Sequence, residues 1–373
     1  MNTINTRCVG KDTLWLPCIL IVSVLLLVGC GDDTSKESKP IKPKQEIVES
    51  KPTYATPKFH LNGKLYSKEL PTAKLKPHKV LTASGNVKDI LVENSLLYAA
   101  TDAGVVDIFD LTTHKRVDQI VIPSFHDDIY DKDLNATIYS VDKVKDRVVL
   151  LTSYKGVKKR LFVYENRGLS EIKGLDPSMM IIKIRMIDKS RVLLGLLSNE
   201  LILYDIDQKK QLYRTSLSES SFSDMALSRD KSSVVVGCES GIIYLVDVAT
   251  GRLKSVIQGA NRDKSYKVDI KNNLVLSAGQ DKIGAIYNIK NNSFKILEAN
   301  FLIYAGALSP DGSRAIFAYN EENELLVVST SGESKEAYLL SGQKSTLNAI
   351  RFRDNQNIIS ASDDEFIMLW QLP

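Results

Sequence analysis

Few side chains of this sequence have the types and spacing that catalysis or metal binding requires. The 373 residues include four His and four Cys. None of them stands in a Cys-x-x-Cys, His-Glu-x-x-His or Cys-x-x-Cys-His pattern, which would bind zinc or attach haem. The Gly-x-Ser-x-Gly turn that presents a nucleophilic serine is also missing from the sequence. We therefore predict a protein that is not an enzyme and that has no catalytic residues, metal ion or cofactor.

Three charged residues are candidates for a role inside the fold. Asp89, Asp224 and Lys267 each interrupt a short apolar run, and they take comparable places in the repeating units described below. We expect these runs to be innermost strands, from which some side chains point into a central channel. Charged groups buried there need partners or water. Two interpretations stay open, a water-filled structural channel and a small-ligand or ion site on its axis.

A modification site is predicted at Asn135. The run Asn135-Ala136-Thr137 is an Asn-x-Thr sequon, and Asp133 ahead of it matches the extended bacterial form of that motif. The sequon stands at the end of an insertion, from Pro123 to Asp133, where a glycan would be accessible. Asn135 is therefore the candidate site of N-glycosylation.

The N-terminal residues predict export. Two basic residues precede an apolar stretch from Cys18 to Val28, which is about half of the roughly 20 residues that a membrane-spanning helix needs. The stretch ends in Leu27-Val28-Gly29-Cys30, which resembles the bacterial lipobox. This resemblance implies that residues 1–29 are a signal peptide, that cleavage falls before Cys30, and that the sulfur of Cys30 carries a diacylglycerol. An uncleaved anchor is the alternative interpretation.

Residues 30–77 are predicted to tether the folded part to a cell membrane on its periplasmic side. The segment is rich in Lys and Pro and has no apolar periodicity. It therefore cannot bury enough surface to offset the entropy of ordering, and we expect a flexible spacer. Inner and outer membrane both remain open. Cleavage and lipidation would leave Cys238 unpaired, so we expect no disulfide within the chain.

Self-similar units follow along the rest of the chain. Each unit ends in a strand-like run that leads to an aromatic or aliphatic residue and then, usually, to a polar one. These residue pairs recur at intervals of about 41 residues, close to the ~40–45 residues of one propeller blade, and the insertion after Pro123 explains one longer interval. Seven pairs predict seven blades of short strands joined by tight turns. The pairs are Phe109-Asp110, Tyr164-Glu165, Tyr204-Asp205, Val246-Asp247, Tyr287-Asn288, Val328-Ser329 and Trp370-Gln371.

The two ends of the repeat region predict how the ring closes. The last unit holds only three strand-like runs, 347–352, 358–362 and 366–372, and lacks an outer strand. An isolated run from Lys79 to Ser84 stands ahead of the first unit and can fill that place, which removes an open sheet edge. We therefore predict an all-β, seven-bladed β-propeller over residues 78–373, closed by an N-terminal strand that completes the last blade.

The charge balance argues against nucleic-acid binding. Lys and Arg number 49 and Asp and Glu number 45, which gives a formal net charge of +4. A chain so nearly balanced lacks the broad basic surface that nucleic-acid binding requires. The expected partners are therefore other proteins, bound at the faces of the propeller, and a membrane, reached through the lipid anchor.

Over residues 78–373 the units resemble WD40 repeats. The Gly-His pair of that family is missing from the sequence, and its Trp-Asp pair survives only as Trp370-Gln371. We therefore expect that the Trp-Ser-His-Asp hydrogen-bond network of the family cannot form. Carboxylates in the turns ahead of several pairs are expected to cap backbone amides, with a ring of negative charge on one face as the alternative. They are Asp102, Glu239, Asp281 and Asp364.

A narrower resemblance is to the NapL-type proteins, exported WD40-like accessory components of periplasmic nitrate reductase systems. It is based on the segments 83–90, 103–110, 197–205 and 342–348. No catalytic motif underlies it. The resemblance implies a non-catalytic, membrane-tethered scaffold that assists the maturation or function of that reductase.

Two other functions remain open. The run from Gly241 to Arg252 resembles the repeat of propeller lipoproteins that assemble outer-membrane proteins. Only one unit shows this pattern, and the chain has two Trp, too few for the repeat to recur in every blade. The third candidate is an exported enzyme, such as a lactonase or a quinoprotein dehydrogenase.

Overall fold

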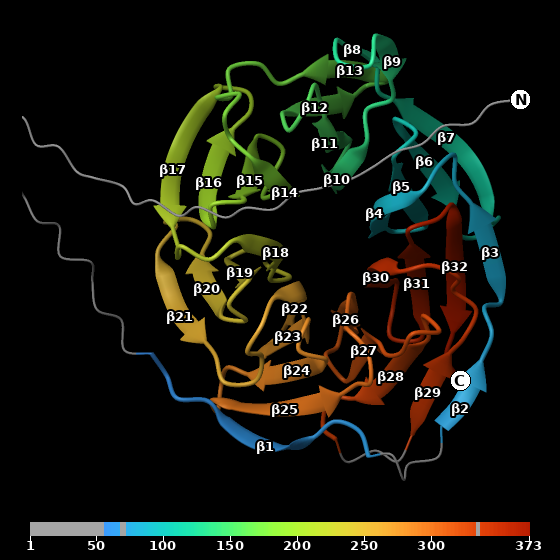
Figure 1. The fold of residues 1–373 in the computed structure, drawn as a ribbon, viewed down its shortest axis with the longest axis vertical. Coiled ribbons are helices and arrows are strands. Elements are labelled where there is room, and N and C mark those ends of the chain that lie inside the picture. Colours follow the sequence, from blue (N-terminus) through green and yellow to red (C-terminus); the bar gives the residue numbers. More distant parts are fainter. Residues whose placement is uncertain (1–55, 68–71, 333–335) are drawn as a thin grey trace, which may run out of the picture. The chain divides into compact units, whose positions relative to one another are not determined.

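A computed structural model of the chain describes residues 56–67, 72–332 and 336–373. These residues form β-strands and no helix. Seven sheets stand around a central axis, each with one edge strand at the axis (Figure 1). The predicted all-β, seven-bladed propeller is therefore confirmed. The predicted signal peptide and Cys30 lie outside the described residues.

Blades 1 to 4 each contain four antiparallel strands, which follow one another from the axis outward. Blade 1 consists of β4 (Val87–Glu93), β5 (Leu96–Thr101), β6 (Val105–Asp110) and β7 (Lys115–Val121). Blade 2 consists of β10 (Ile138–Val144), β11 (Arg147–Ser153), β12 (Lys159–Glu165) and β13 (Gly168–Glu171). Blade 3 consists of β14 (Ile181–Met186), β15 (Arg191–Leu196), β16 (Glu200–Asp205) and β17 (Lys210–Ser216). Blade 4 consists of β18 (Phe222–Leu227), β19 (Ser233–Cys238), β20 (Ile243–Asp247) and β21 (Leu253–Ile257).

Blades 5 to 7 each include a strand from the N-terminal part of the chain. Blade 5 consists of β22 (Ser265–Lys271), β23 (Leu274–Gly279), β24 (Ile283–Asn288), β25 (Ser293–Glu298) and β1 (His60–Lys64). Blade 6 consists of β26 (Gly306–Leu308), β27 (Arg314–Ala318), β28 (Leu325–Ser329), β29 (Ala337–Leu340) and β2 (Thr72–Leu75). Blade 7 consists of β30 (Leu347–Phe352), β31 (Asn357–Ser362), β32 (Phe366–Gln371) and β3 (Lys79–Thr82). A hairpin of β8 (Phe125–Asp127) and β9 (Lys132–Leu134) stands between blades 1 and 2.

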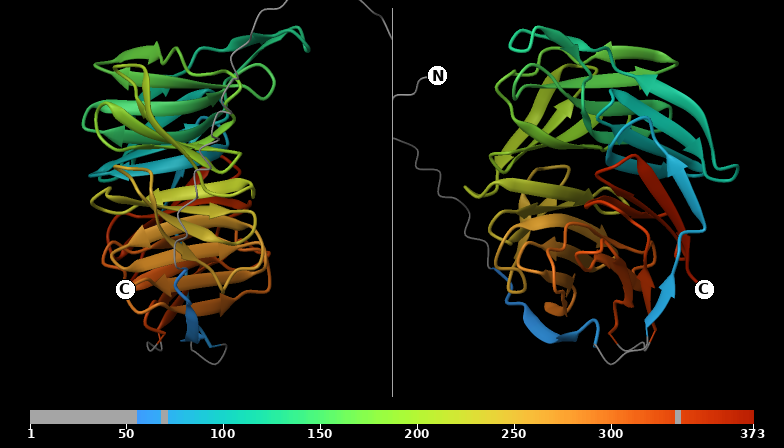
Figure 2. Two further views of the ribbon diagram at one scale, coloured as in Figure 1. Left: turned by 90° about the vertical axis from the view of Figure 1, so that its left-hand side faces the viewer. Right: turned by 45° about the vertical axis from the view of Figure 1, so that its right-hand side comes forward.

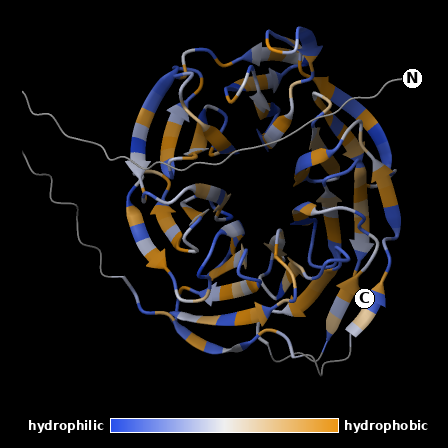
Figure 3. Ribbon diagram, viewed as in Figure 1, coloured by the Kyte–Doolittle hydropathy of each residue, from blue (hydrophilic) through white to orange (hydrophobic). Residues whose placement is uncertain are grey.

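The hydrophobic core lies between neighbouring blades. Because both faces of each sheet are covered, the middle strands are continuous apolar runs instead of alternating ones. In β15, for example, every residue after Arg191 is buried. Figure 3 shows these hydrophobic stretches along the strands and hydrophilic stretches in the loops that join them. Full burial of each large aliphatic side chain contributes roughly 1.5–3 kcal/mol, so packing between blades is the main source of stability.

The ring closes at blade 7 as the sequence predicts. β3 pairs antiparallel with β32, with Leu81 opposite Ile367. The backbone amide of Ala83 extends this pairing by donating to the carbonyl oxygen of Glu365 at 2.8 Å. Leu81 is buried in the apolar cluster that blades 7 and 1 share. The first and last parts of the chain therefore form one sheet.

The N-terminal boundary of the propeller differs from the prediction. Residues 60–64 and 72–75, expected to lie in a flexible tether, form β1 and β2, which pair in parallel with the outer strands β25 and β29. The predicted tether is therefore too long at its C-terminal end. The strand β1 could not be predicted from composition, because it covers only an outer edge of the sheet and its side chains stay exposed. Main-chain hydrogen bonds and a few anchors, such as buried Leu65, hold it instead.

Blade 7 contains a hydrogen-bond network that was not predicted from the sequence. The Trp370 indole donates to Ser360 Oγ at 2.9 Å, and this hydroxyl donates to Gln343 Oε1 at 2.9 Å. The Gln343 amide then donates to Ser362 Oγ at 2.6 Å, which donates to Asp364 at 2.8 Å. The histidine-containing network of the WD40 family does not form here, as expected, but an amide takes the place of histidine in a related network. Like an imidazole, the amide carries a donor and an acceptor on separate atoms.

Blade 5 contains a similar but shorter network with another aromatic residue. Tyr287 takes the place of the Trp and interacts with Ser277. Ser277 donates to the Asn261 side-chain oxygen, and the Asn261 amide donates to Asp281 at 3.1 Å. Burial raises the pKa of the Tyr287 hydroxyl to about 12. It therefore stays protonated and can act as a donor.

The turn carboxylates mostly act as caps of backbone amides, as expected. Asp102 accepts a hydrogen bond from the amide of Asn86 at 2.9 Å, Asp281 accepts one from Arg262 at 2.8 Å, and Asp364 accepts one from Phe366 at 3.0 Å. Such bonds hold the tight turns in place.

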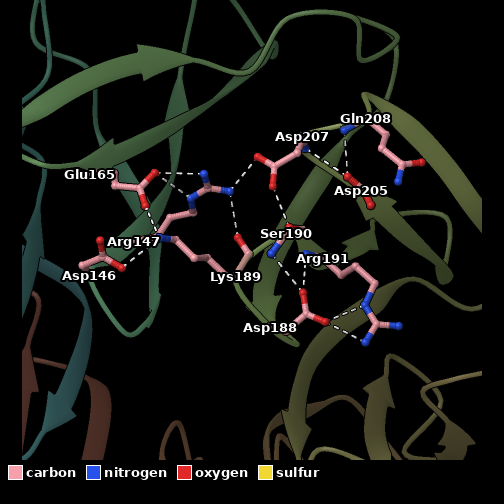
Figure 4. A network of polar contacts seen from close by, with 10 residues as sticks. All are labelled: Asp146, Arg147, Glu165, Asp188, Lys189, Ser190, Arg191, Asp205, Asp207 and Gln208. Carbon is pink, nitrogen blue, oxygen red and sulfur yellow. Dashed lines mark hydrogen bonds and ion pairs between the residues drawn. The ribbon is translucent and has the colours of Figure 1, made fainter.

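Charged side chains fasten blades 2 and 3 to each other on one face of the ring. The largely buried guanidinium of Arg147, at the start of β11, forms ion pairs with Glu165 of its own blade at 2.9 Å and with Asp207 of blade 3 at 2.7 Å. It also donates to the backbone carbonyl of Lys189 at 2.9 Å. Figure 4 shows Arg147 between these groups, with the Lys189 ammonium beside Glu165. One arginine thus contacts both blades at once.

Candidate functional site

The innermost strands place Asp89, Asp224 and Lys267 at equivalent positions. Each of the three is the first residue after a bulge in the pairing of the first two strands of its blade. Asp89 and Asp224 are buried and Lys267 is partly buried. The bulge turns all three side chains to the same side, toward the axis of the ring.

Lys183 joins the two aspartates. It stands at the same register position in β14 of blade 3, after the bulge in that strand. Its ammonium lies 3.4 Å from a carboxylate oxygen of Asp89 and 3.6 Å from one of Asp224. The side chain of Lys183 is 9% exposed and those of the aspartates are 2% and 7% exposed, so all three charges are shielded from water.

Two arginines complete the cluster around Asp89. Arg351 lies 3.3 Å and Arg185 4.0 Å from its carboxylate. The roles of Lys183, Arg185 and Arg351 were not predicted from the sequence. A signal was nevertheless present, because each of them lies on an innermost strand at, or two residues after, the position of Asp89. Side chains two residues apart on a strand share one face.

The electrostatics of the cluster follow from its burial. Burial alone would raise the pKa of Asp89, but four surrounding cations, Lys183 first among them, outweigh it and lower the pKa. Burial lowers the pKa of Lys183 to about 8, against the opposing effect of Asp89. Asp89 is therefore ionised at neutral pH, and Lys183 is mostly charged.

The buried aspartates also fasten neighbouring blades through backbone amides. Asp224 accepts a hydrogen bond from the amide of Val268 in blade 5 at 3.3 Å, and Asp89 accepts a longer one from blade 2 at 3.4 Å. Asp142 lies on the innermost strand of blade 2, two residues after the position equivalent to Asp89. Its carboxylate accepts a hydrogen bond from the backbone amide of Met186 in blade 3 at 2.7 Å. Burial raises the pKa of Asp142. These aspartates therefore have a structural role as links between blades.

The channel contains a cavity of about 430 Å³. Residues of all seven innermost strands line it, Asp224 and Lys267 among them. It spans the later halves of these strands, as Ile90–Glu93 in β4 and Val268 in β22 show. The cavity therefore lies toward the face where each innermost strand turns into the second strand of its blade.

The opposite face carries the β8–β9 hairpin. Phe125 of β8 packs against Tyr154 of blade 2, with ring centroids 5.4 Å apart. The buried Asp127 accepts hydrogen bonds from the amides of Ile129 at 2.9 Å and Tyr130 at 3.1 Å, which fixes the turn. Ile129 and Tyr130 are 83% and 67% exposed. Figure 2 shows the hairpin extending beyond the rest of the ring.

More exposed apolar side chains lie on the face that carries the hairpin. Because the strands of a blade are antiparallel, the connections between blades and the loops between second and third strands lie at one face, which we call the hairpin face. Exposed apolar residues in these segments of blades 2 and 3 are Val157, Met180 and Leu197. Asn135, the candidate glycosylation site, is exposed on the same face, after β9.

Other features of the described residues bear on the remaining predictions. Within residues 56–67, 72–332 and 336–373, no His, Cys, Asp and Glu side chains are grouped as a metal ion would require. No helix able to cross a membrane occurs in these ranges. Cys238 is buried and unpaired.

The chain was compared with models of protein families and with curated proteins, and neither comparison found a match.

Proposed function

We propose that this protein is a non-catalytic scaffold that binds other proteins through the hairpin face of its propeller. The observation that carries the proposal is the pair Ile129 and Tyr130, held by a fixed turn with most of their apolar surface in water. Exposed apolar groups on a fixed turn are typical of protein-binding sites, because the backbone does not have to be ordered on binding. Charges of both signs lie beside the pair, since Lys155 pairs with Asp128 at 2.7 Å and the Lys132 ammonium lies 5.6 Å from the centre of the Tyr130 ring. The partner is therefore expected to offer an apolar pocket with a polar rim.

The proposed location is the periplasmic side of a cell membrane, with a lipid on Cys30 as the anchor. The first described residues lead into β1 on the outside of blade 5, whereas the hairpin lies across the ring at blade 2 (Figure 1). This arrangement supports a hairpin that is accessible to a partner while the N-terminus is tethered.

The proposed pathway is the maturation or function of periplasmic nitrate reductase, in the manner of the NapL-type, WD40-like proteins. The Trp370–Ser360–Gln343 network supports the WD40-like part of this proposal. Deletion of the gene is expected to lower nitrate reductase activity and the cofactor content of the enzyme, measured in periplasmic extracts. Unchanged activity and cofactor content would remove the pathway assignment but leave the scaffold.

Removal of the two exposed side chains should abolish partner binding. The double variant Ile129→Ser, Tyr130→Ser is expected to weaken binding to purified periplasmic nitrate reductase by about 30-fold or more, since truncation of a central apolar anchor costs about 2 kcal/mol or more. Interferometry with the immobilised full chain measures the dissociation constant. The matched control, Val117→Ser with Val121→Ser, removes two exposed apolar side chains from the outer strand β7.

The possible outcomes test the identity of the partner and the position of the binding surface independently. Equal loss of binding in both double variants would contradict a specific role of the hairpin. If the unaltered chain does not bind the reductase, a photoreactive residue at position 129 identifies the bound protein by crosslinking in cells, and the two variants are compared with that protein. No crosslink above that from position 117 would remove the hairpin face as the binding surface.

A further inference from the structure

Two charged groups of the channel, Asp224 and Lys267, are only partly compensated by their neighbours. Oδ1 of Asp224 accepts no hydrogen bond although its side chain is about nine-tenths buried, and the nearest ammonium, that of Lys183 at 3.6 Å, is shared with Asp89. Lys267, at the same position on the neighbouring strand β22, forms no hydrogen bond or ion pair with any residue that the structure describes. An unmatched buried polar atom such as Oδ1 of Asp224 costs about 1–3 kcal/mol, so a role for it is expected.

The charges around the cavity are not balanced. Six basic residues line it, Lys143, Arg185, Lys231, Lys267, Lys271 and Arg351. Four acidic residues line it, Glu93, Asp142, Asp224 and Asp269. Three of these acids already have partners, because Lys143 pairs with Glu93, Lys271 pairs with Asp269 at 2.8 Å, and backbone amides bond to Asp142. A cleft with excess positive charge concentrates anions.

The cavity has room for a small molecule. Its volume of about 430 Å³ lies within the range of roughly 300–1,000 Å³ that small-molecule sites occupy. Blades 6 and 7 have Ala305 and Ala349 at the position that Asp89, Asp224 and Lys267 take in their blades. These residues lack long side chains, so the channel is not filled from that side.

We propose that the channel cavity binds a small carboxylate that also carries a hydrogen-bond donor, an α-hydroxy or α-amino dicarboxylate. One carboxylate pairs with Lys267. The hydroxyl or ammonium group donates to the carboxylate of Asp224, which lines the cavity. Arg351 pairs with Asp89 at 3.3 Å, but its side chain is 32% exposed, so its remaining N–H groups can reach the second carboxylate. This site lies at the face opposite the hairpin, so it does not depend on the proposed scaffold function.

Calorimetry with defined probes tests the proposal on the purified full chain. Malate and aspartate represent the hydroxy and amino classes, and succinate has the two carboxylates without the donor. Malate or aspartate is expected to bind at least about 10-fold more tightly than succinate, because a hydrogen bond to a charged group contributes about 1.5–3 kcal/mol. Tighter binding of malate would identify the ligand as an α-hydroxy dicarboxylate, and tighter binding of aspartate would identify it as an α-amino dicarboxylate.

Two variants assign the groups. Lys267→Met should weaken the binding of all three probes by about 10-fold or more, because it removes the unpaired cation. Asp224→Asn should remove the preference for malate or aspartate over succinate while succinate binding persists. The control Lys115→Met lies on the exposed outer strand β7 and should leave every affinity unchanged. Circular dichroism confirms that each variant is folded.

Three results would overturn the proposal. They are no heat of binding with any of the dicarboxylates, unchanged affinity in Lys267→Met, and succinate or inorganic phosphate binding as tightly as malate and aspartate. Should Asp224→Asn fail to fold, the comparison of succinate with malate and aspartate on the unaltered chain still decides whether the donor is recognised.

Discussion

Replacement of Asp89 by alanine is expected to lower the free energy of unfolding by about 3–5 kcal/mol, the usual cost of removing one partner from a buried ion pair. The carboxylate of Asp89 lies within 4.0 Å of Lys183, Arg185 and Arg351. Without it, three cations would face each other in a site shielded from water. Urea denaturation followed by circular dichroism measures the change.

A second substitution shows whether charge is the cause. Lys183→Met removes the most buried of the three cations, so the double variant Asp89→Ala, Lys183→Met should recover part of the lost stability. The matched control is Asp102→Ala, at a carboxylate in an exposed turn, which should cost about 1 kcal/mol or less. A loss below about 1 kcal/mol for Asp89→Ala, or strict additivity in the double variant, would contradict the buried cluster.

The pH dependence of stability should follow from the same cluster. The pKa of folded Asp89 is lowered, so its contribution is present above the unfolded value of about 3.9 and is lost as the pH falls below it. The pKa of Lys183 is lowered to about 8 in the folded chain. Between about 8 and the unfolded value of about 10.4 the unfolded chain binds more protons, so this lysine makes stability rise with pH. Lys183→Met should remove that rise.

Introduction of a charge at Leu81 should prevent the ring from closing. Leu81 is 4% exposed, opposite Ile367 in the strand pair that joins the two ends of the ring. Leu81→Asp loses the packing of a core leucine and buries a carboxylate without a partner, a combined cost of more than about 4 kcal/mol. Because β3 has only four residues, we expect the pairing with β32 to be lost and the open edge to aggregate.

The adjacent residue provides the control. Val80 belongs to the same short strand but is 41% exposed, so Val80→Asp should change the unfolding free energy by about 1 kcal/mol or less. Size-exclusion chromatography and thermal unfolding compare the two variants. Equal stability of Leu81→Asp and the unaltered chain would show that β3 is not needed for closure.

The propeller could be predicted because its signals are local. Apolar runs and turn residues recur at a regular interval, and each blade is built from strands adjacent in sequence. The closing strand could also be predicted, because the last unit visibly lacks an outer strand while an isolated run stands ahead of the first unit. The equivalence of Asp89, Asp224 and Lys267 followed from the same repeat.

The partners of those residues could not be predicted in the same way. Lys183 lies between two aspartates of different blades only because the ring brings blades 1, 3 and 4 to a common axis. Gln343 could be recognised as a replacement for histidine only through its contacts with Ser360 and Ser362.

The sequence by itself determined the fold class, the number of blades and the strand that closes the ring, because strand and turn patterns depend on neighbouring residues. The tertiary structure decided that residues 60–64 and 72–75 belong to blades 5 and 6, which charges share the channel, and where the exposed hairpin lies. These features depend on main-chain pairing and electrostatic contacts between residues far apart in the chain. Such contacts leave no periodic pattern in the sequence.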